Sequence, residues 1–177
     1  MEKIINDEFI LQIVTEQAWK ELSGNFTWTE TLLEKFYDKV DWKLISENRS
    51  IRWTLPMLNK FSRRVDWKAL SQVNTEWFTE AHLEAFKDKW DWSELVHYYN
   101  LTEKQIDKYI DYINWEELIG VGCSGWNSPL PNDDNFDAIA FYEKYKQHIP
   151  MSKFQDSLLW ERIVEQKCRQ LKAEIMS

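Results

Sequence analysis

The fold of this chain is decided by residues 54–71, which read TLPMLNKFSRRVDWKALS. Related stretches are residues 29–46, which read TETLLEKFYDKVDWKLIS, and residues 79–96, which read TEAHLEAFKDKWDWSELV. In each copy a threonine is followed by apolar residues at steps of three and four, and then by an Asp-Trp pair. Steps of three and four place side chains on one face of a helix. Each copy therefore predicts a helix of about three turns and then a shorter helix that begins at Asp-Trp.

The polar residues of each copy have predicted roles at helix ends. Thr54 precedes the longer helix, where its hydroxyl can accept a hydrogen bond from an unpaired backbone N–H as an N-cap. Asp66 is the predicted N-cap of the short helix, and Asn114 takes this place before Trp115. Asn48 follows a short helix and suits a left-handed C-cap position. Because each has a local backbone role, we interpret these residues as structural.

The repeat extends toward both ends of the chain. Near the N-terminus, Asn6 takes the place of the capping threonine, with Ile10 and Ile13 at the apolar positions. Near the C-terminus, Pro150 takes the place of the capping aspartate, and residues 157–176 carry an apolar stripe that is typical of a closing helix. The apolar register of this last unit is kept by Tyr142, Tyr145, Ile149, Met151 and Phe154.

The period of the repeat predicts the architecture. Trp19, Trp42, Trp67, Trp92 and Trp115 are separated by 23 to 25 residues, and a fixed period of this length is typical of stacked helical units. We therefore expect one all-α domain over residues 1–177, a short α-solenoid of about six such units. Its repeats occupy about residues 6–119, a loop insertion occupies 120–135, and the last repeat with its capping helix occupies 136–177.

A family resemblance supports this architecture. The string FKDKWDW at residues 86–92, and the spacing Asp-Trp-x-x-Leu-Ser-x-Asn followed by Trp-Thr, resemble Trp-rich tandem repeats of uncharacterised proteins from bacteria, phages and giant viruses. The resemblance covers roughly residues 19–118 and implies a helical repeat fold, with no activity or ligand attached. The chain departs from the pattern at residues 97–99, where His-Tyr-Tyr replaces a serine-containing loop, and at the insertion after Trp115.

Composition narrows the class of protein. The 177 residues include 30 acids and 22 bases, a net charge of −8, which disfavours direct binding to nucleic acid. No apolar run approaches the roughly 18 residues of a membrane span, so no membrane partner is expected. Two cysteines are too few for a disulfide framework. These features favour a cytoplasmic setting.

The loop insertion at residues 120–135 is the candidate location of a catalytic or ligand-binding site. Residues 120–125 read GVGCSG and match the dinucleotide-binding pattern G-x-G-x-x-G. That motif needs a preceding strand and a following helix, whereas here a short helix precedes it and prolines follow it. A flexible connection between units is the favoured interpretation. Cys123 lacks a histidine at a fixed spacing that could act as the base for a nucleophilic thiol, because His82, His97 and His148 are scattered along the chain. His82 is expected to have a half-buried packing role. No two His or Cys lie at ligand spacing, so no metal or cofactor is expected.

Charge is unevenly distributed along the chain. Residues 43–68 carry seven bases and two acids, whereas residues 76–117 carry eleven acids and four bases. Repeats need no such asymmetry, so the field of a partner is one explanation, and drift of surface residues is the other. The candidate partner-binding residues are Glu84, Asp88, Asp107 and Asp111 among the acids, Arg49, Arg63 and Arg64 among the bases, and Trp126 in the insertion.

These observations favour a non-enzymatic protein–protein interaction module, because solenoids present extended surfaces. The alternative is an acidic, phage-type inhibitor that mimics nucleic acid and blocks a DNA- or RNA-binding defence protein. In both cases the partner is another protein, and in the second it is a basic one. An enzyme that uses residues 120–135 is the least favoured of the three hypotheses.

Overall fold

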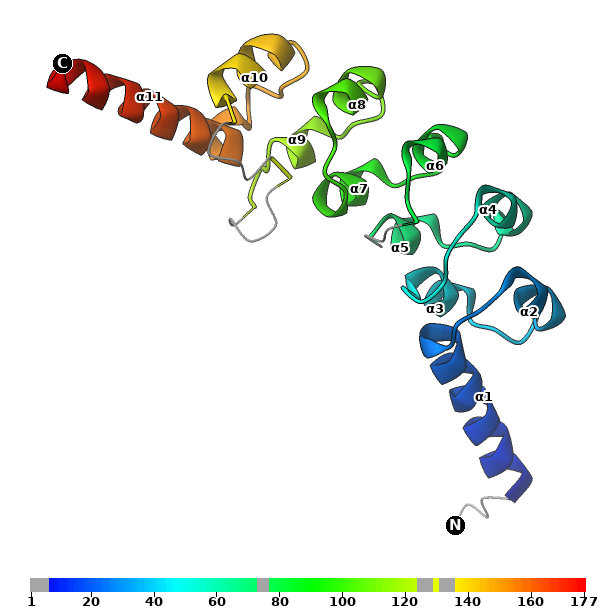
Figure 1. Cartoon of the computed structure of the whole chain (residues 1–177). Coiled ribbons are helices and arrows are strands. Elements are labelled where there is room, and N and C mark those ends of the chain that lie inside the picture. The colour runs from blue at the N-terminus through cyan, green and yellow to red at the C-terminus, as the bar shows by residue number, and fades with distance from the viewer. Residues whose placement is uncertain (1–6, 73–76, 124–128, 131–135) are drawn as a thin grey trace. The chain divides into compact units, whose positions relative to one another are not determined.

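The computed structural model describes residues 7–72, 77–123, 129–130 and 136–177 (Figure 1). Within them the regular elements are helices, and the single β-type contact is an isolated antiparallel bridge between Val121 and Ser157. The predicted all-α class is therefore confirmed. By its internal contacts the chain divides into two compact units, Met1–Trp90 and Asp91–Ser177.

Helices account for most of both units, and Figure 1 labels them along the chain. The first unit contains α1 (Asp7–Asn25), α2 (Glu30–Lys35), α3 (Trp42–Glu47), α4 (Leu55–Phe61), α5 (Trp67–Ser71) and α6 (Glu80–Ala85). The second contains α7 (Trp92–Tyr98), α8 (Glu103–Lys108), α9 (Trp115–Leu118), α10 (Ala138–Tyr145), the 3₁₀ helix η2 (Phe154–Asp156) and α11 (Leu158–Met176).

The helices start where the caps predict, which confirms the interpretation of these polar residues as structural. The hydroxyl of Thr54 accepts a hydrogen bond from the N–H of Met57, and Asp66 accepts one from the N–H of Ala69. The same geometry recurs in the other copies. Further threonine caps are Thr29 and Thr102, and further caps of the short helices are Asp41, Asp91 and Asn114.

The longer helix of each copy is shorter than the predicted three turns. Helix α2 has six residues, because Phe36 leaves the helical region with φ −112° and ψ 24°. The N–H groups of Lys39 and Val40 then bond to the Phe36 carbonyl at 2.9 and 3.2 Å and close a turn that leads to Asp41. The aromatic residue thus ends the helix while its side chain still belongs to the apolar face.

Asn48 has a different role from the predicted left-handed cap, and that prediction is wrong. Its backbone is extended, with φ −73° and ψ 107°, and glycines are the only described residues with positive φ. The buried side chain instead donates from Nδ2 to the carbonyls of Ser23 and Phe26, both at 2.9 Å, while its Oδ1 accepts from the N–H of Ser50. Asn48 therefore joins the residues after α3 to the end of α1.

A buried serine makes a second contact between successive copies. Ser46 Oγ donates to the Trp42 carbonyl at 2.7 Å within α3 and accepts from the N–H of Asp66 at 2.9 Å. Ser23 does the same with the Trp19 carbonyl and the N–H of Asp41. The hydroxyl satisfies the backbone N–H of the next helix cap, which would otherwise be partly buried without a partner.

The repeat tryptophans pack against the aromatic residue of the following helix, a contact that the sequence analysis did not predict. The ring centroids of each pair lie 5.1 to 5.4 Å apart, with interplanar angles of 40° to 46°. An aromatic contact of this kind contributes about 0.5–1.5 kcal/mol beyond area burial. The pairs are Trp19–Phe36, Trp42–Phe61 and Trp67–Phe86 in the first unit, and Trp92–Tyr109 and Trp115–Tyr145 in the second.

His82 is buried rather than half-buried and links α6 to the residues before α4. The N–H of Thr79 donates to its Nδ1 at 3.3 Å, and its Nε2 lies 3.2 Å from the Trp53 carbonyl. A neutral ring that carries its proton on Nε2 satisfies both contacts. Burial lowers the pKa of His82, and the contact with Trp53 only partly opposes this effect.

The N-terminal copy differs from the predicted helix pair. Helix α1 runs unbroken through Trp19, and Ile10 and Ile13, which were expected on the packed face, are about half exposed. Asn6 lies outside the described residues. The absence of an Asp-Trp break before Trp19, where alanine precedes the tryptophan, removes the cap that starts a short helix elsewhere.

The C-terminal copy keeps part of its predicted register. Tyr145 and Ile149 are buried, but Phe141 rather than Tyr142 fills the buried position of α10, and Met151 is exposed. With Pro150 in place of the capping aspartate, the expected short helix is reduced to the 3₁₀ turn η2. Helix α11 follows and packs on α10 and η2.

Candidate functional site

Asp107, one of the predicted partner-binding acids, is engaged within the second unit. Its carboxylate accepts from the Tyr145 hydroxyl at 2.7 Å and from the Lys144 ammonium at 3.0 Å. The bond from Tyr145, followed by that from Lys144, lowers the pKa of Asp107. Asp107 thus joins α8 to α10, while its side chain is still 50% exposed, so its expected role in contacting a partner stays a prediction.

The first unit has an equivalent charged contact. Lys60 on α4 pairs with Glu30 at 2.8 Å and also with Glu34, both on α2. Lys144 on α10 pairs with Glu103 at 3.1 Å and with Asp107. The two contacts have the same pattern. The lysine directly precedes an aromatic residue of its helix, and its acidic partners are the first and fifth residues of an earlier helix. These charges serve packing between helices.

The other three predicted acids are exposed as well. Glu84 on α6 pairs with Lys87 at 3.3 Å. Asp88 lies in the turn after α6, and Asp111 lies in the turn after α8. Their carboxylates are at the surface and remain candidates for contact with a partner.

The basic candidates are exposed as well. Arg64 lies over the ring of Tyr37 at 4.6 Å, donates from Nε to its hydroxyl at 2.8 Å, and pairs with Asp38 at 3.6 Å. It therefore joins the turn after α4 to the turn after α2, while its side chain is 46% exposed, so its expected role in contacting a partner stays a prediction. Arg49 and Arg63 are exposed. Trp126 lies outside the described residues.

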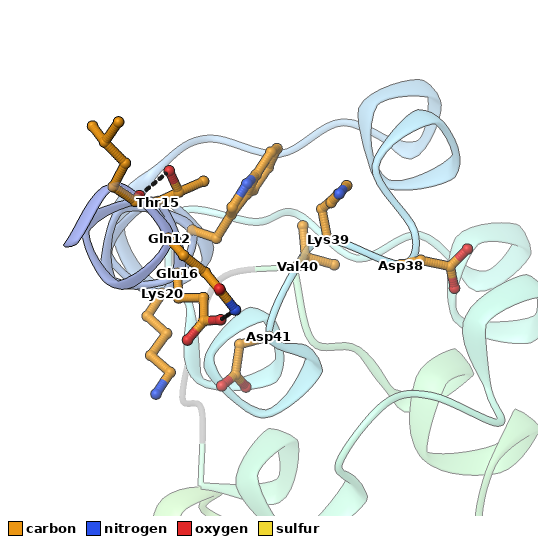
Figure 2. Close-up of a pocket in the computed structure, with 10 residues that line it drawn as sticks. Gln12, Thr15, Glu16, Lys20, Asp38, Lys39, Val40 and Asp41 are labelled. Carbon is orange, nitrogen blue, oxygen red and sulfur yellow. Dashed lines mark hydrogen bonds between the residues drawn. The ribbon is translucent and has the colours of Figure 1, made fainter. Parts of the chain in front are cut away.

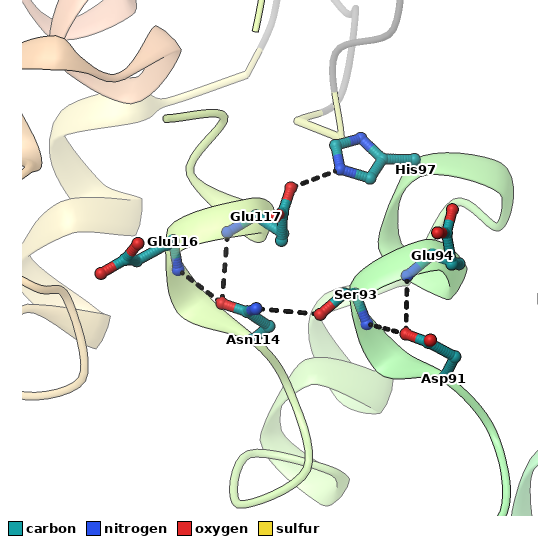
Figure 3. Close-up of polar contacts among 7 residues, drawn as sticks. All are labelled: Asp91, Ser93, Glu94, His97, Asn114, Glu116 and Glu117. Carbon is teal, nitrogen blue, oxygen red and sulfur yellow. Dashed lines mark hydrogen bonds and ion pairs between the residues drawn. The ribbon is translucent and has the colours of Figure 1, made fainter. Parts of the chain in front are cut away.

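A polar cluster that sequence reasoning missed lies between α7 and α9 (Figure 3). His97 Nε2 lies 2.7 Å from a carboxylate oxygen of Glu117, and Asn114 donates from Nδ2 to Ser93 Oγ at 2.9 Å. The only sequence signal was the departure from the repeat at residues 97–99, because a separation of 20 positions between His97 and Glu117 matches no ligand or catalytic motif.

Cys123 is close enough to this cluster to be affected by it. Burial, followed by the charge of Glu117, raises the pKa of the Cys123 thiol. A nucleophilic cysteine needs the opposite shift, because the thiolate is the reactive form. The arrangement therefore keeps Cys123 protonated.

The first residues of the predicted flexible insertion are held by backbone bonds. The Gly120 carbonyl accepts from the N–H of Leu158 at 3.3 Å, and the N–H of Gly122 donates to the Asp156 carbonyl at 3.3 Å. Gly120 and Gly122 have φ of +72° and +70°, and a Cβ at Gly120 would lie 2.8 Å from the Leu158 side chain. These glycines make a close contact with the start of α11 and do not form a phosphate cradle. Gly125 lies outside the described residues.

An open groove of about 670 Å³ runs along α1 in the first unit (Figure 2). One wall is α1 itself, with Leu11, Thr15 and Trp19, and the other is the turn at residues 38–41. Both charges and apolar side chains line it. Among its charged residues, Asp41 caps α3 and Asp38 pairs with Arg64.

The described residues can be compared with the requirements of a metal cluster and of a membrane-spanning helix. It contains no group of three His, Cys, Asp or Glu that could hold a metal ion. None of its helices is both long and apolar enough to cross a lipid bilayer. Comparison with known protein families, with curated proteins and with solved structures gives no match for this chain.

Proposed function

We propose that the chain is a non-enzymatic protein–protein interaction module, an α-solenoid of about six helical units with a modified unit at each end. The observation that carries the proposal is the use of the polar signature residues. Thr54 and Asp66 cap helices, Ser46 binds the next cap, and Asn48 binds two carbonyls of the preceding copy. Residues that recur for such reasons maintain a scaffold and leave the variable surface for recognition.

The aromatic pairs support the stacking part of the proposal. The same tryptophan contact occurs five times with nearly the same geometry, including Trp115–Tyr145, which bridges the insertion. Units that each pack on their sequence neighbours form an extended structure with a large surface relative to its core. Such surfaces are typical of proteins that bind other proteins.

The electrostatics of Cys123 weigh against the enzyme hypothesis. Its pKa is raised by burial and by Glu117, and the glycines before it are committed to backbone contacts with α11. A site for acyl or phosphoryl transfer would need an activated nucleophile or free backbone donors at this place.

An acidic surface remains a second candidate for recognition. Three exposed acids, Glu84, Asp88 and Asp111, lie in the stretch with a net charge of −7 between residues 76 and 117. They favour a basic partner, as the nucleic-acid-mimic alternative requires. Asp107 is exposed as well, but it is left out of the charge reversal because its bonds to Tyr145 and Lys144 join α8 to α10.

The experiment is a comparison of two charge-reversal variants against a partner captured from native lysate and then purified. One variant carries Glu84→Lys, Asp88→Lys and Asp111→Lys, and the other carries Arg49→Glu and Arg63→Glu. If the acidic surface binds, the first variant lowers the association rate and its salt dependence, and the second does not. Unchanged rates for both variants at two salt concentrations would exclude charge-guided binding, and failure to capture any protein would contradict the interaction module.

A further inference from the structure

The first unit has an apolar hollow on the face of α1 and α2. Its volume is about 230 Å³, and no polar surface lines it. It lies near the C-terminal end of α1, beside the first of the tryptophan–aromatic pairs. The lining residues are Trp19, Leu22, Phe26, Trp28, Leu32 and Phe36.

Residues at the same repeat positions are buried in the next copy. Leu22 is 44% exposed, whereas Ile45, which holds the same position after the next tryptophan, is 0% exposed. Phe36 is half-buried, whereas Phe61 is 2% exposed. In the next copy, neighbouring helices cover these positions. The hollow therefore has the features of a helix-packing site whose neighbour is missing.

Helix α11 in the second unit has an apolar face that matches such a site. Val164, Cys168, Leu171 and Ile175 follow one another at steps of four, three and four, which is the spacing of a coiled-coil seam. Val164 is 42% exposed, Leu171 44% and Ile175 83%. Only the first turns of α11 are packed, around the buried Leu159.

The charges of the two surfaces are complementary. Helix α1 (residues 7–25) contains four acids and one lysine, whereas the seam segment of α11 (residues 164–175) contains three bases and two acids. Pairing of α11 with a second α11 would place Lys167, Arg169 and Lys172 near like charges, and pairing of α1 with a second α1 would gather acids. Opposite charge favours α1 and α2 as the partner of α11.

We propose that two copies of this chain associate head to tail, with the exposed seam of α11 in one copy seated in the hollow of α1 and α2 in the other. The contact buries Leu171 and its seam neighbours against Leu22 and Phe26 and places the bases of α11 beside the acids of α1. Such a contact is heterologous, so the pair keeps one unused α11 seam and one unused hollow, to which further copies can add.

The test uses two variants that each block one end. Leu171→Glu places a charge in the seam, and Phe26→Glu places one in the hollow, both at exposed positions where circular dichroism checks the fold. Leu22→Glu is the second hollow variant, and Gln170→Glu is the matched control on the exposed surface of α11. Sedimentation velocity from 1 to 200 µM measures the mass of each species, for which the chain mass is 21.5 kDa.

The expected result is a mass that rises with concentration for the wild type and for Gln170→Glu, and a monomer for Leu171→Glu, Phe26→Glu and Leu22→Glu. An equimolar mixture of Leu171→Glu and Phe26→Glu has one intact end of each kind, so it should form a species of twice the chain mass and none larger. A monomeric wild type at 200 µM overturns the proposal. Loss of association in Leu171→Glu alone, with no rescue on mixing, indicates symmetric pairing of α11 and also overturns it.

Discussion

Replacement of Asn48 should destabilise the first unit by an amount that its contacts define. The side chain is buried, donates to the carbonyls of Ser23 and Phe26 at 2.9 Å, and accepts from the N–H of Ser50. A typical hydrogen bond contributes about 1 kcal/mol net, and a buried group left without a partner costs about 1–3 kcal/mol. Because Ser23 is buried and its carbonyl loses this bond, we expect Asn48→Ala to lower the free energy of unfolding by about 2–4 kcal/mol.

The substitution Asn48→Gly distinguishes the observed role from the predicted left-handed cap. Glycine would be tolerated at a left-handed position, but the φ of Asn48 is −73°, so glycine should cost at least as much as alanine. Urea unfolding followed by circular dichroism at 222 nm measures both variants, with the exposed Asn59→Ala as the control, expected within about 0.5 kcal/mol of wild type. A glycine variant as stable as wild type would refute the role assigned to Asn48.

Three further predictions concern buried or strained positions. Because the pKa of His82 is lowered in the folded chain, the unfolded chain binds a proton at a higher pH, near 6.5, than the folded chain does. The free energy of unfolding should therefore fall from pH 7 to pH 5, and it should fall less in His82→Gln. An equal fall in both proteins would contradict the effect of burial on His82. Gly120→Ala should cost more than Gly122→Ala in urea unfolding, because both have positive φ but only Gly120 meets Leu158; equal costs would remove the steric argument. In a Cys168→Ser protein, the labelling of Cys123 by iodoacetamide should become fast only at a higher pH than the labelling of an ordinary exposed thiol, because the pKa of Cys123 is raised. Fast labelling at pH 7 would support the enzyme hypothesis.

The sequence predicted the local parts of the fold well because caps depend on residues close in the chain. Thr54 and Asp66 act through backbone N–H groups three residues away. Contacts between copies were harder to predict. The bond from Asn48 to Ser23 spans 25 residues and depends on how two helices lie, so the local preference of asparagine for left-handed backbone was a misleading guide. The packing of Trp67, which is half-buried against Phe86 and Trp90, likewise depends on residues about 20 positions away.

The candidate surface was predicted only in part. Charge counting identified acidic and basic stretches, but it could not show that Asp107 is bonded to Tyr145 and Lys144, whereas Asp111 lies in the turn after α8. The two residues are about one helical turn apart, and the contact with α10 is what distinguishes Asp107 from Asp111. The exposed seam of α11 was visible as an apolar stripe, and the sequence favoured a packed closing helix because apolar stripes are usually covered.

The central claim is that each repeat tryptophan packs on the aromatic residue of the following helix, and the coupling between Trp42 and Phe61 tests it most directly. A double-mutant cycle with Trp42→Leu and Phe61→Leu keeps apolar volume in place, and urea unfolding gives the free energy of each variant. The ring centroids are 5.2 Å apart, so the account predicts a coupling free energy of about 0.5–1.5 kcal/mol. Additive effects, with a coupling below about 0.3 kcal/mol, would contradict the stacking of these units.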